Sequence, residues 1–202
     1  HFGFSSIEHP CISEPIKSLV HQGFMVSEIP VDSNGIFNVS DIPDEKRQSL
    51  TFLSVMMANN ETGVIQNISE IANWSRENKI QFHTDAVQAL GKIKVDFETL
   101  DIDAMTISSH KIYGPQGIAA LIVNKKIDLS PFMQGGGQEK GLRSGTENIA
   151  AIIGFGKACE RSNQNRVRFE QNINLLKLTL EKALKELGAI IFCENSRRLS
   201  NT

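Results

Sequence analysis

The chain has 202 residues, of which 40% are hydrophobic and 22% are charged, and its formal net charge is −2. These proportions are typical of a globular protein, and the length suffices for one large domain or for one domain and part of a second. The charge excludes a global basic field that would collect nucleic acid, and no apolar run approaches the ~20 residues of a membrane helix. Three cysteines far apart in the sequence argue against a disulfide scaffold and favour a reducing compartment.

Short apolar and β-branched runs predict the strands of one sheet. They lie, in chain order, at residues 24–30, 50–57, 80–84, 104–107 and 118–123. A turn is expected at Asn34-Gly35, after the first run. Between the second and third runs, residues 67–78 have helical spacing, with Asn67 as N-cap and Glu70 as its capping-box partner. This alternation indicates an α/β domain with a largely parallel sheet covered on both faces.

The last quarter of the chain has mainly helical spacing. Helices are expected over residues 148–159 and 164–187, and a strand over residues 189–193. The second helix and the strand have the pattern of a new unit that begins here. We therefore divide the chain into residues 1–165, part of a large domain, and residues 166–202, the start of a small one.

Polar side chains follow three of the predicted strands, at the edge where α/β sheets bind their ligands. These are Asn59 to Gly63 after the first, Asp85 and Gln88 after the second, and Ser108, His110 and Lys111 after the third. A lysine in such a setting can form a Schiff base, and a neighbouring aspartate can keep a pyridinium nitrogen protonated. Gln88, in the first turn of a following helix, would reach a ring oxygen. The combination describes a pyridoxal phosphate site.

The same residues also permit plainer interpretations. Asp85 at a strand end can be a helix cap, and His110 beside Lys111 can be a polar surface turn. His83, Asp85 and His110 are possible zinc ligands. Five of the 15 glycines lie between residues 135 and 145, in a loop that is either a mobile linker or a close approach to a ligand or another chain.

Four motifs resemble the cysteine desulfurases of the nitrogen-fixation and iron–sulfur-cluster type, in the same order and spacing. They are Ala58-Asn59-Asn60-Glu61-Thr62-Gly63, His83-Thr84-Asp85-Ala86-Val87-Gln88, Ser109-His110-Lys111-Ile112-Tyr113-Gly114-Pro115, and the stretch from Gly135-Gly136-Gly137-Gln138-Glu139 to Arg143-Ser144-Gly145-Thr146-Glu147-Asn148. The resemblance implies a fold-type I, pyridoxal-phosphate-dependent transferase of the class V aminotransferase kind. Its large domain would have a mostly parallel sheet of the seven-stranded type, followed by a small α+β C-terminal domain.

The resemblance also implies roles for single residues. Lys111 matches the lysine that holds the cofactor as a Schiff base and takes the α-proton of the substrate. His9, which the residues alone would mark as a helix-entry residue, matches a histidine that stacks on the cofactor ring and moves protons. The other implied cofactor contacts are Asp85 to the pyridine nitrogen, Gln88 to the phenolic oxygen, Ser108 and His110 to the phosphate, Asn60 near the ring oxygen and the substrate carboxylate, and Thr146 to the phosphate of the neighbouring subunit.

The implied activity is that of a cysteine desulfurase, which converts L-cysteine to L-alanine and passes the sulfur to an enzyme cysteine as a persulfide for iron–sulfur cluster assembly. The implied partners are a second copy in a homodimer and a scaffold or other sulfur-acceptor protein, in the cytoplasm, without direct contact to nucleic acid or membrane. Two alternatives stay open: another pyridoxal phosphate enzyme of the same fold (a selenocysteine lyase or an aminotransferase), or a non-catalytic desulfurase-like scaffold.

None of the three cysteines matches the nucleophilic thiol of that family. Cys159 and Cys193 have the spacing of core residues, and Cys11, two residues from His9, matches no family cysteine. The phosphate-binding loop and the arginine that grips the substrate carboxylate have no counterpart in the chain, which opens on His1. We therefore expect an internal segment of a longer enzyme, which by itself makes no persulfide.

Overall fold

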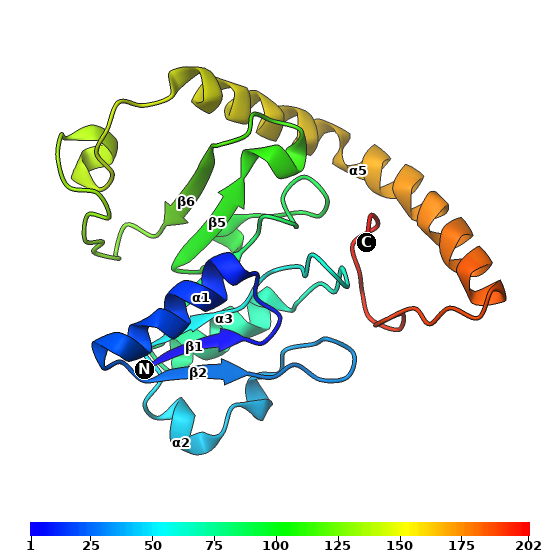
Figure 1. Ribbon diagram of the computed structural model, residues 1–202, viewed down its shortest axis with the longest axis horizontal. Coiled ribbons are helices and arrows are strands. Elements are labelled where there is room, and N and C mark those ends of the chain that lie inside the picture. Colours follow the sequence, from blue (N-terminus) through cyan, green and yellow to red (C-terminus); the bar gives the residue numbers. More distant parts are fainter.

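Six strands form a single sheet in the computed structural model, which describes residues 1–202 (Figure 1). The strands are β1 (Phe2–Ser5), β2 (Val26–Ile29), β3 (Phe52–Ser54), β4 (Gln81–Asp85), β5 (Ala104–Ser108) and β6 (Ala119–Val123). Their order is β2-β1-β3-β4-β5-β6, in which β1 to β5 run parallel and β6 runs antiparallel to β5. The predicted α/β class and mostly parallel sheet are confirmed, with six strands of the expected seven-stranded type in this chain.

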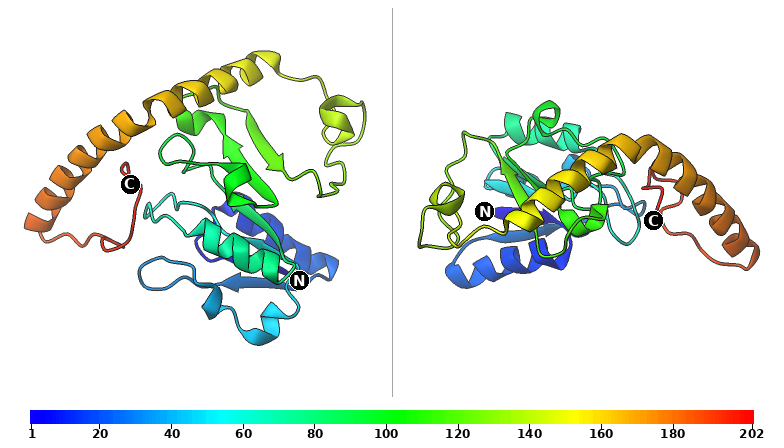
Figure 2. Two further views of the ribbon diagram at one scale, coloured as in Figure 1. Left: turned by 180° about the vertical axis from the view of Figure 1, so that it is seen from behind. Right: turned by 90° about the horizontal axis from the view of Figure 1, so that it is seen from above.

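Helices flank this sheet. They are α1 (Pro10–Ser18), α2 (Asp44–Arg47), α3 (Ile68–Glu77), α4 (Phe97–Leu100) and α5 (Ile149–Glu186), and the short 3-10 helices are η1 (Leu19–Gln22), η2 (Val39–Asp41), η3 (Ser109–Ile112) and η4 (Gln138–Gly141). The front and back views place α1 and α3 on opposite faces of the sheet (Figures 1 and 2). No helix is long and apolar enough to span a membrane.

The core lies between the central strands and the helices. Leu53 on β3 pairs in register with Phe82 on β4, and both side chains are buried. Ile68 and Ile71 on α3 belong to the same apolar cluster. A parallel strand covered on both faces buries alternate residues on each face, which explains why continuous apolar runs predicted these strands.

Strand β1 and the start of α3 differ from the sequence prediction. The sequence predicts no strand at Phe2–Ser5, yet β1 lies between β2 and β3 in the sheet interior. Four residues are too few for a periodicity to stand out, and the strand is defined by the ladders of its two neighbours. Asn67 does precede α3, but its side chain donates to the Glu70 carboxylate (2.7 Å) and caps no backbone group. The predicted capping box is therefore wrong in its bonding.

The helical C-terminal part also departs from the prediction. A single helix, α5, replaces the two predicted helices, so the predicted domain division at residue 165 falls inside a continuous element and stays a prediction. The strand predicted at residues 189–193 is wrong, because residues 189–191 are irregular, residues 192 and 193 lie in a turn, and no neighbouring strand lies beside them to supply a ladder. Ile190 and Phe192 are exposed there, and Cys193 has a positive φ of 52°.

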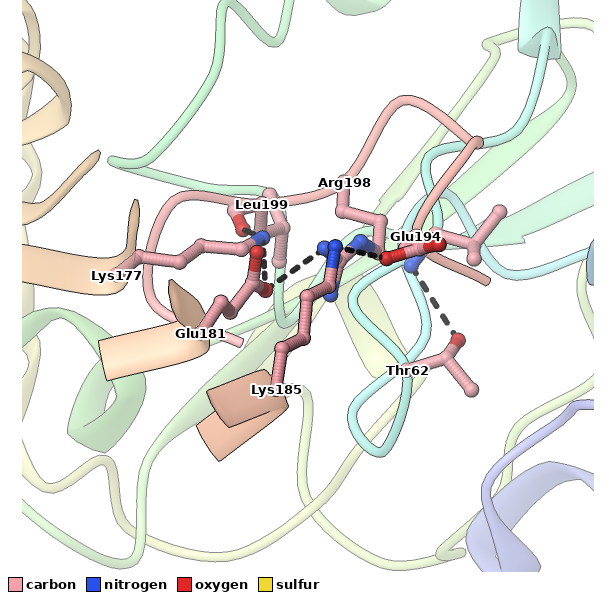
Figure 3. A network of polar contacts seen from close by, with 8 residues as sticks. Thr62, Lys177, Glu181, Lys185, Glu194, Arg198 and Leu199 are labelled. Atoms are coloured by element: carbon pink, nitrogen blue, oxygen red, sulfur yellow. Dashed lines mark hydrogen bonds and ion pairs between the residues drawn. The ribbon is translucent and has the colours of Figure 1, made fainter. Parts of the chain in front are cut away.

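The C-terminal segment folds back from the end of α5 toward the sheet (Figure 2). The Leu199 amide donates to the Gly63 carbonyl (2.8 Å), and the Ile65 amide donates to the Arg197 carbonyl (2.9 Å). Figure 3 shows how side chains hold this segment to α5: Arg198 pairs with Glu181 at 2.7 Å, and Lys177 donates to the Leu199 carbonyl at 2.8 Å. The segment thereby braces the loop that follows β3.

Candidate functional site

The loops at the carboxyl ends of β1 and β3 interlock. Glu8, in the loop after β1, accepts hydrogen bonds from the Met56 amide (2.5 Å) and from the hydroxyl of Ser5 (2.7 Å). In return the Asn59 amide side chain donates to the Ile7 carbonyl (2.9 Å). Because β1, β3, β4 and β5 run parallel, their following loops all meet at this edge, and the sequence predicted this for the last three of them.

Asp85 lies at the end of β4 and is buried. Its Oδ1 accepts one hydrogen bond, from the Val87 amide (2.8 Å), and its Oδ2 accepts none. Burial raises the pKa of Asp85, while the Val87 amide and the nearby His9 act in the opposite direction. A buried carboxylate with a free oxygen is stabilised by a cationic partner, and the chain supplies no salt bridge to it.

His9 begins α1, which confirms the helix-entry interpretation. It is the N-cap, its Nδ1 accepts a hydrogen bond from the Cys11 amide (3.2 Å), and Pro10 follows at the first helical position. The ring is exposed, and its charge acts on Asp85. His9 and Asp85 therefore belong to one electrostatic neighbourhood.

Ser108, His110 and Lys111 lie where β5 passes into η3. The Ser108 hydroxyl and His110 Nδ1 are hydrogen-bonded at 2.9 Å. Lys111 is exposed, whereas the next residue, Ile112, is buried. The buried isoleucine anchors the turn and leaves the lysine amine accessible.

A cavity of about 660 Å³ lies beside this turn. Gln88, His110 and Lys111 line it, together with Lys92 from the turn after β4 and Arg161 from α5. No aspartate or glutamate lines it. Three of the predicted site residues thus share one cationic cavity that favours an anionic ligand.

Two other predicted site residues, Asn60 and Thr146, do not line the cavity. Asn60 is half-buried and donates to the Glu61 carboxylate (2.7 Å), and it does not line the cavity. Thr146 is exposed, with no hydrogen bond from its side chain, in the segment that follows the edge strand β6. Its predicted contact to a neighbouring subunit stays a prediction.

Two of the plainer interpretations are corrected by the structure. Both ring nitrogens of His83 are occupied, Nδ1 by the Ser54 hydroxyl and Nε2 by the Thr106 hydroxyl, each at 2.9 Å. No three His, Cys, Asp or Glu side chains are grouped to hold a metal ion, which contradicts the zinc alternative. Asp85 caps no helix, because residues 87–92 form turns, and Gln88 therefore lies in a turn and not in the first turn of a helix.

Sequence reasoning missed two buried charged residues at the site. Glu8 is buried with its Oε2 unpartnered, and burial raises its pKa to about 7. Lys92 is buried, and its ammonium donates to the Gln88 amide oxygen at 2.6 Å. The only available indications were positional: Glu8 directly precedes His9, and Lys92 follows Gln88 by four residues, which in turns of helical curvature brings side chains together.

Comparisons with known proteins extend over nearly the whole chain. A mitochondrial cysteine desulfurase of Candida maltosa is 41% identical over 199 residues, which cover 96% of this chain and 41% of the relative. A cysteine desulfurase IscS of Clostridium botulinum is 38% identical over 185 residues, covering 92% of this chain and 47% of the relative. The chain thus spans less than half the length of these two relatives.

Solved structures and a family model agree with these relatives. The X-ray structure of a NifS-like protein from Rickettsia africae superposes with a TM-score of 0.91 at 37% identity, covering 98% of this chain and 55% of that one. SspA in complex with cysteine has a TM-score of 0.73 at 36% identity, covering 79% of this chain and 47% of that one. The model of the aminotransferase class-V family matches residues 1–202. The chain therefore belongs to the aminotransferase class-V family.

Proposed function

We propose that this chain carries the cofactor site of a pyridoxal-phosphate-dependent cysteine desulfurase. The observation that carries the proposal is that Lys111 and Gln88 line one cavity beside the strand that ends in the buried Asp85. Members of the class V aminotransferase family are pyridoxal-phosphate-dependent enzymes. The motifs around these three residues match the desulfurase branch, and the relatives at about 40% identity carry desulfurase names.

The donor set of the site fits pyridoxal phosphate. The buried Asp85 has a free carboxylate oxygen that can accept from a protonated pyridine nitrogen, and the raised pKa of Asp85 falls once such a cation pairs with it. Ser108 and His110 offer a hydroxyl and an imidazole for the phosphate, and Gln88 offers amide N–H donors for the phenolic oxygen. Asn60, from the loop after β3, is the proposed contact near the ring oxygen and the substrate carboxylate.

The catalytic work of the chain falls to Lys111 and His9. When bound, pyridoxal phosphate supplies an electron sink for the negative charge left on the substrate Cα. The Lys111 amine would hold the cofactor covalently. Once the amine of the substrate has displaced it, the freed Lys111 amine would be the base for the Cα proton, and its exposure on the cavity wall is compatible with both roles. His9, at the start of α1, would stack on the ring and move a proton at its imidazole nitrogen.

L-cysteine is the proposed substrate, and alanine and an enzyme-bound persulfide are the proposed products. A related structure, SspA, was solved in complex with cysteine, and relatives are named cysteine desulfurases. None of the chain's three cysteines lines the cavity, so the 202 residues alone are expected to make no persulfide. The sulfur then passes to a scaffold or other acceptor protein for iron–sulfur cluster assembly.

The proposal also includes a homodimer and a cytoplasmic location. Thr146 would reach the phosphate bound by the neighbouring subunit, which its exposed position beyond β6 permits. Some relatives are mitochondrial by name, and others are bacterial, so the location stays a prediction.

The test uses the full-length protein that carries this chain, loaded with pyridoxal phosphate. Lys111→Ala is expected to abolish the visible absorption band of the bound cofactor and the release of sulfide and alanine from L-cysteine. Lys125→Ala, at an exposed position after β6, serves as the control and should leave both unchanged. A band that survives Lys111→Ala would disprove the lysine assignment.

The same assay separates the alternatives. Preference for selenocysteine, or transfer of the amino group to an oxo acid without sulfide release, would favour a selenocysteine lyase or an aminotransferase. Failure of the unsubstituted protein to bind pyridoxal phosphate would favour a non-catalytic scaffold.

A further inference from the structure

The turn after β4 holds a lysine whose surroundings are unusual for an ammonium group. Lys92 is only 8% exposed, and no carboxylate pairs with it. A buried ammonium without an acidic partner costs free energy that an apolar side chain of similar length would not. Its side-chain partner is neutral: Nζ donates to Gln88 Oε1 at 2.6 Å.

That hydrogen bond decides which way the Gln88 amide faces. An ammonium group only donates, so the acceptor atom of the amide, Oε1, must face Lys92. The Nε2 group then faces away from Lys92, and it has no acceptor within the chain. Since Gln88 lines the cavity beside Lys111, its two N–H groups remain available to a ligand there.

The turn itself is fixed against the rest of the site. Gly91, directly before Lys92, has a φ of 75°, and a Cβ placed on it would lie 2.8 Å from the Ser162 Cβ on α5 and 2.9 Å from the Ile112 Cγ2 beside Lys111. Such close packing keeps the backbone at Lys92 in register with η3. The backbone that carries Lys92 is therefore held in place when its side chain donates to Gln88.

We propose that Lys92 is a positioning residue whose ammonium holds the Gln88 amide with Nε2 donating into the cofactor site. The inference rests on the proposed function and adds to it a residue that makes no contact with the cofactor itself. Without Lys92, the amide can turn over and present its oxygen to the phenolic oxygen of the ring, where two acceptors repel.

The charge state of Lys92 is compatible with this role. Burial and the charge of Lys111 lower the pKa of Lys92 to about 8, so the ammonium predominates at neutral pH. The other charged or titratable groups that line the cavity are Lys111, His110, Tyr113 and Arg161.

The experiment is a double-mutant cycle in the full-length protein, read out as the Kd for pyridoxal phosphate and the position of its visible band. Lys92→Met is expected to weaken binding roughly 5- to 10-fold, the usual worth of one ordinary intramolecular hydrogen bond, and to shift the band. Lys92→Arg, which keeps a cationic donor, should restore both. Lys94→Met, at an exposed lysine two residues on, should change neither.

The cycle then repeats Lys92→Met in protein that already carries Gln88→Met. If Lys92 acts through the amide, Lys92→Met adds no further loss of affinity there, whereas a long-range charge effect of Lys92 would add in full. Equal effects in both backgrounds, or no effect of Lys92→Met alone, would overturn the inference. Should Lys92→Met fail to fold, Lys92→Ala takes its place in the same cycle.

The two proposals fail in distinguishable ways. If the unsubstituted protein binds no pyridoxal phosphate, the proposed function is wrong and this inference is overturned with it. If the unsubstituted protein binds the cofactor and Lys111→Ala abolishes the band, additive effects of Lys92 and Gln88 overturn the inference alone.

Discussion

Glu8 shows how much a single buried side chain contributes to the chemistry of the site. Its Oε1 accepts from the Ser5 hydroxyl and the Met56 amide, while its Oε2 is buried without a partner. Burial is the largest cause that raises the pKa of Glu8 to about 7, and the negative charge of Asp85 adds to it. The side chain therefore changes protonation near neutral pH, one residue from His9.

Glu8→Gln is expected to change how stability depends on pH. The pKa of Glu8 is about 7 in the folded protein and 4.5 as the ordinary value, so its protonated form stabilises the fold below pH 4.5 and that contribution is lost as pH rises through 7. Glutamine does not ionise and escapes this loss. Relative to the unsubstituted protein, the variant should gain up to about 3 kcal/mol between pH 4.5 and pH 8.

Thermal unfolding at several pH values measures this gain. Glu14→Gln, at an exposed position on α1, is the matched control and should show no such gain. Parallel pH profiles for Glu8→Gln and the unsubstituted protein would contradict the raised pKa of Glu8.

Cys11→Ser is expected to leave sulfide release from L-cysteine within about twofold of the unsubstituted protein. Burial and the charges of Asp85 and Glu8 all raise the pKa of the Cys11 thiol, so little of the nucleophilic thiolate forms. The assay is made on the full-length protein. A large loss of activity would show that this thiol takes part in the reaction.

At the scale of single residues, the sequence predicted which side chains the strand ends bring together. It did not predict which charged side chains are buried. Gln88 and Lys111 were expected to meet because they follow neighbouring parallel strands, and they do line one cavity. Glu8 and Lys92 escaped because hydrophobic periodicity treats every charged residue as solvent-facing. Only the folded structure shows which charged side chains are buried away from solvent.

Among the elements, the contact between α5 and the turn after β4 depends on a glycine. Gly91→Ala is expected to destabilise the protein by about 1–3 kcal/mol beyond the cost of the left-handed backbone, because the new Cβ overlaps Ser162 and Ile112. The cofactor affinity should fall with it, since Ile112 anchors the turn that carries Lys111. Thermal unfolding and cofactor titration measure the two effects.

Gly117→Ala is the control for the backbone alone. Gly117 has nearly the same φ, 76°, and nothing lies within 4 Å of a Cβ placed there. It should cost only the ~1–2 kcal/mol of the left-handed conformation. Equal losses in the two variants would mean that the packing of α5 against the turn carries no energy.

Element prediction succeeded where local pattern and tertiary packing agree. The apolar run at residues 50–57 contains β3 because a strand buried on both faces needs such a run. At residues 189–193 an equally apolar run is no strand, because a strand exists only where a neighbour completes its ladder. For the same reason β1, only four residues long, escaped prediction although it pairs with a strand on each side.

At the scale of the whole molecule, the C-terminal segment links α5 to the loop after β3. The ion pair of Arg198 and Glu181 holds this segment to α5 (Figure 3). Both side chains are largely buried. Arg198→Met removes the pairing partner and leaves Glu181 with the 4.0 Å contact to Lys177. We expect residues 187–197 to be cleaved about tenfold faster in limited proteolysis, because breaking a buried pair leaves an uncompensated charge.

The exposed pair of Lys157 and Glu160 provides the comparison. Exposed pairs contribute little, so Lys157→Met should leave the cleavage rate unchanged. A similar rate in Arg198→Met and the unsubstituted protein would show that the backbone contacts of the segment suffice to hold it.

The hydrogen bond between Leu199 and Gly63 also constrains the order of events during translation. Gly63 leaves the ribosome long before Leu199, and the loop with Asn60 precedes its brace by most of the chain. The sheet strands β1 to β5 can pair while synthesis continues, whereas this loop must wait for the far end of α5. Newly made protein would therefore acquire its sheet first, and the loop with Asn60 would gain its last support only when Leu199 has been added.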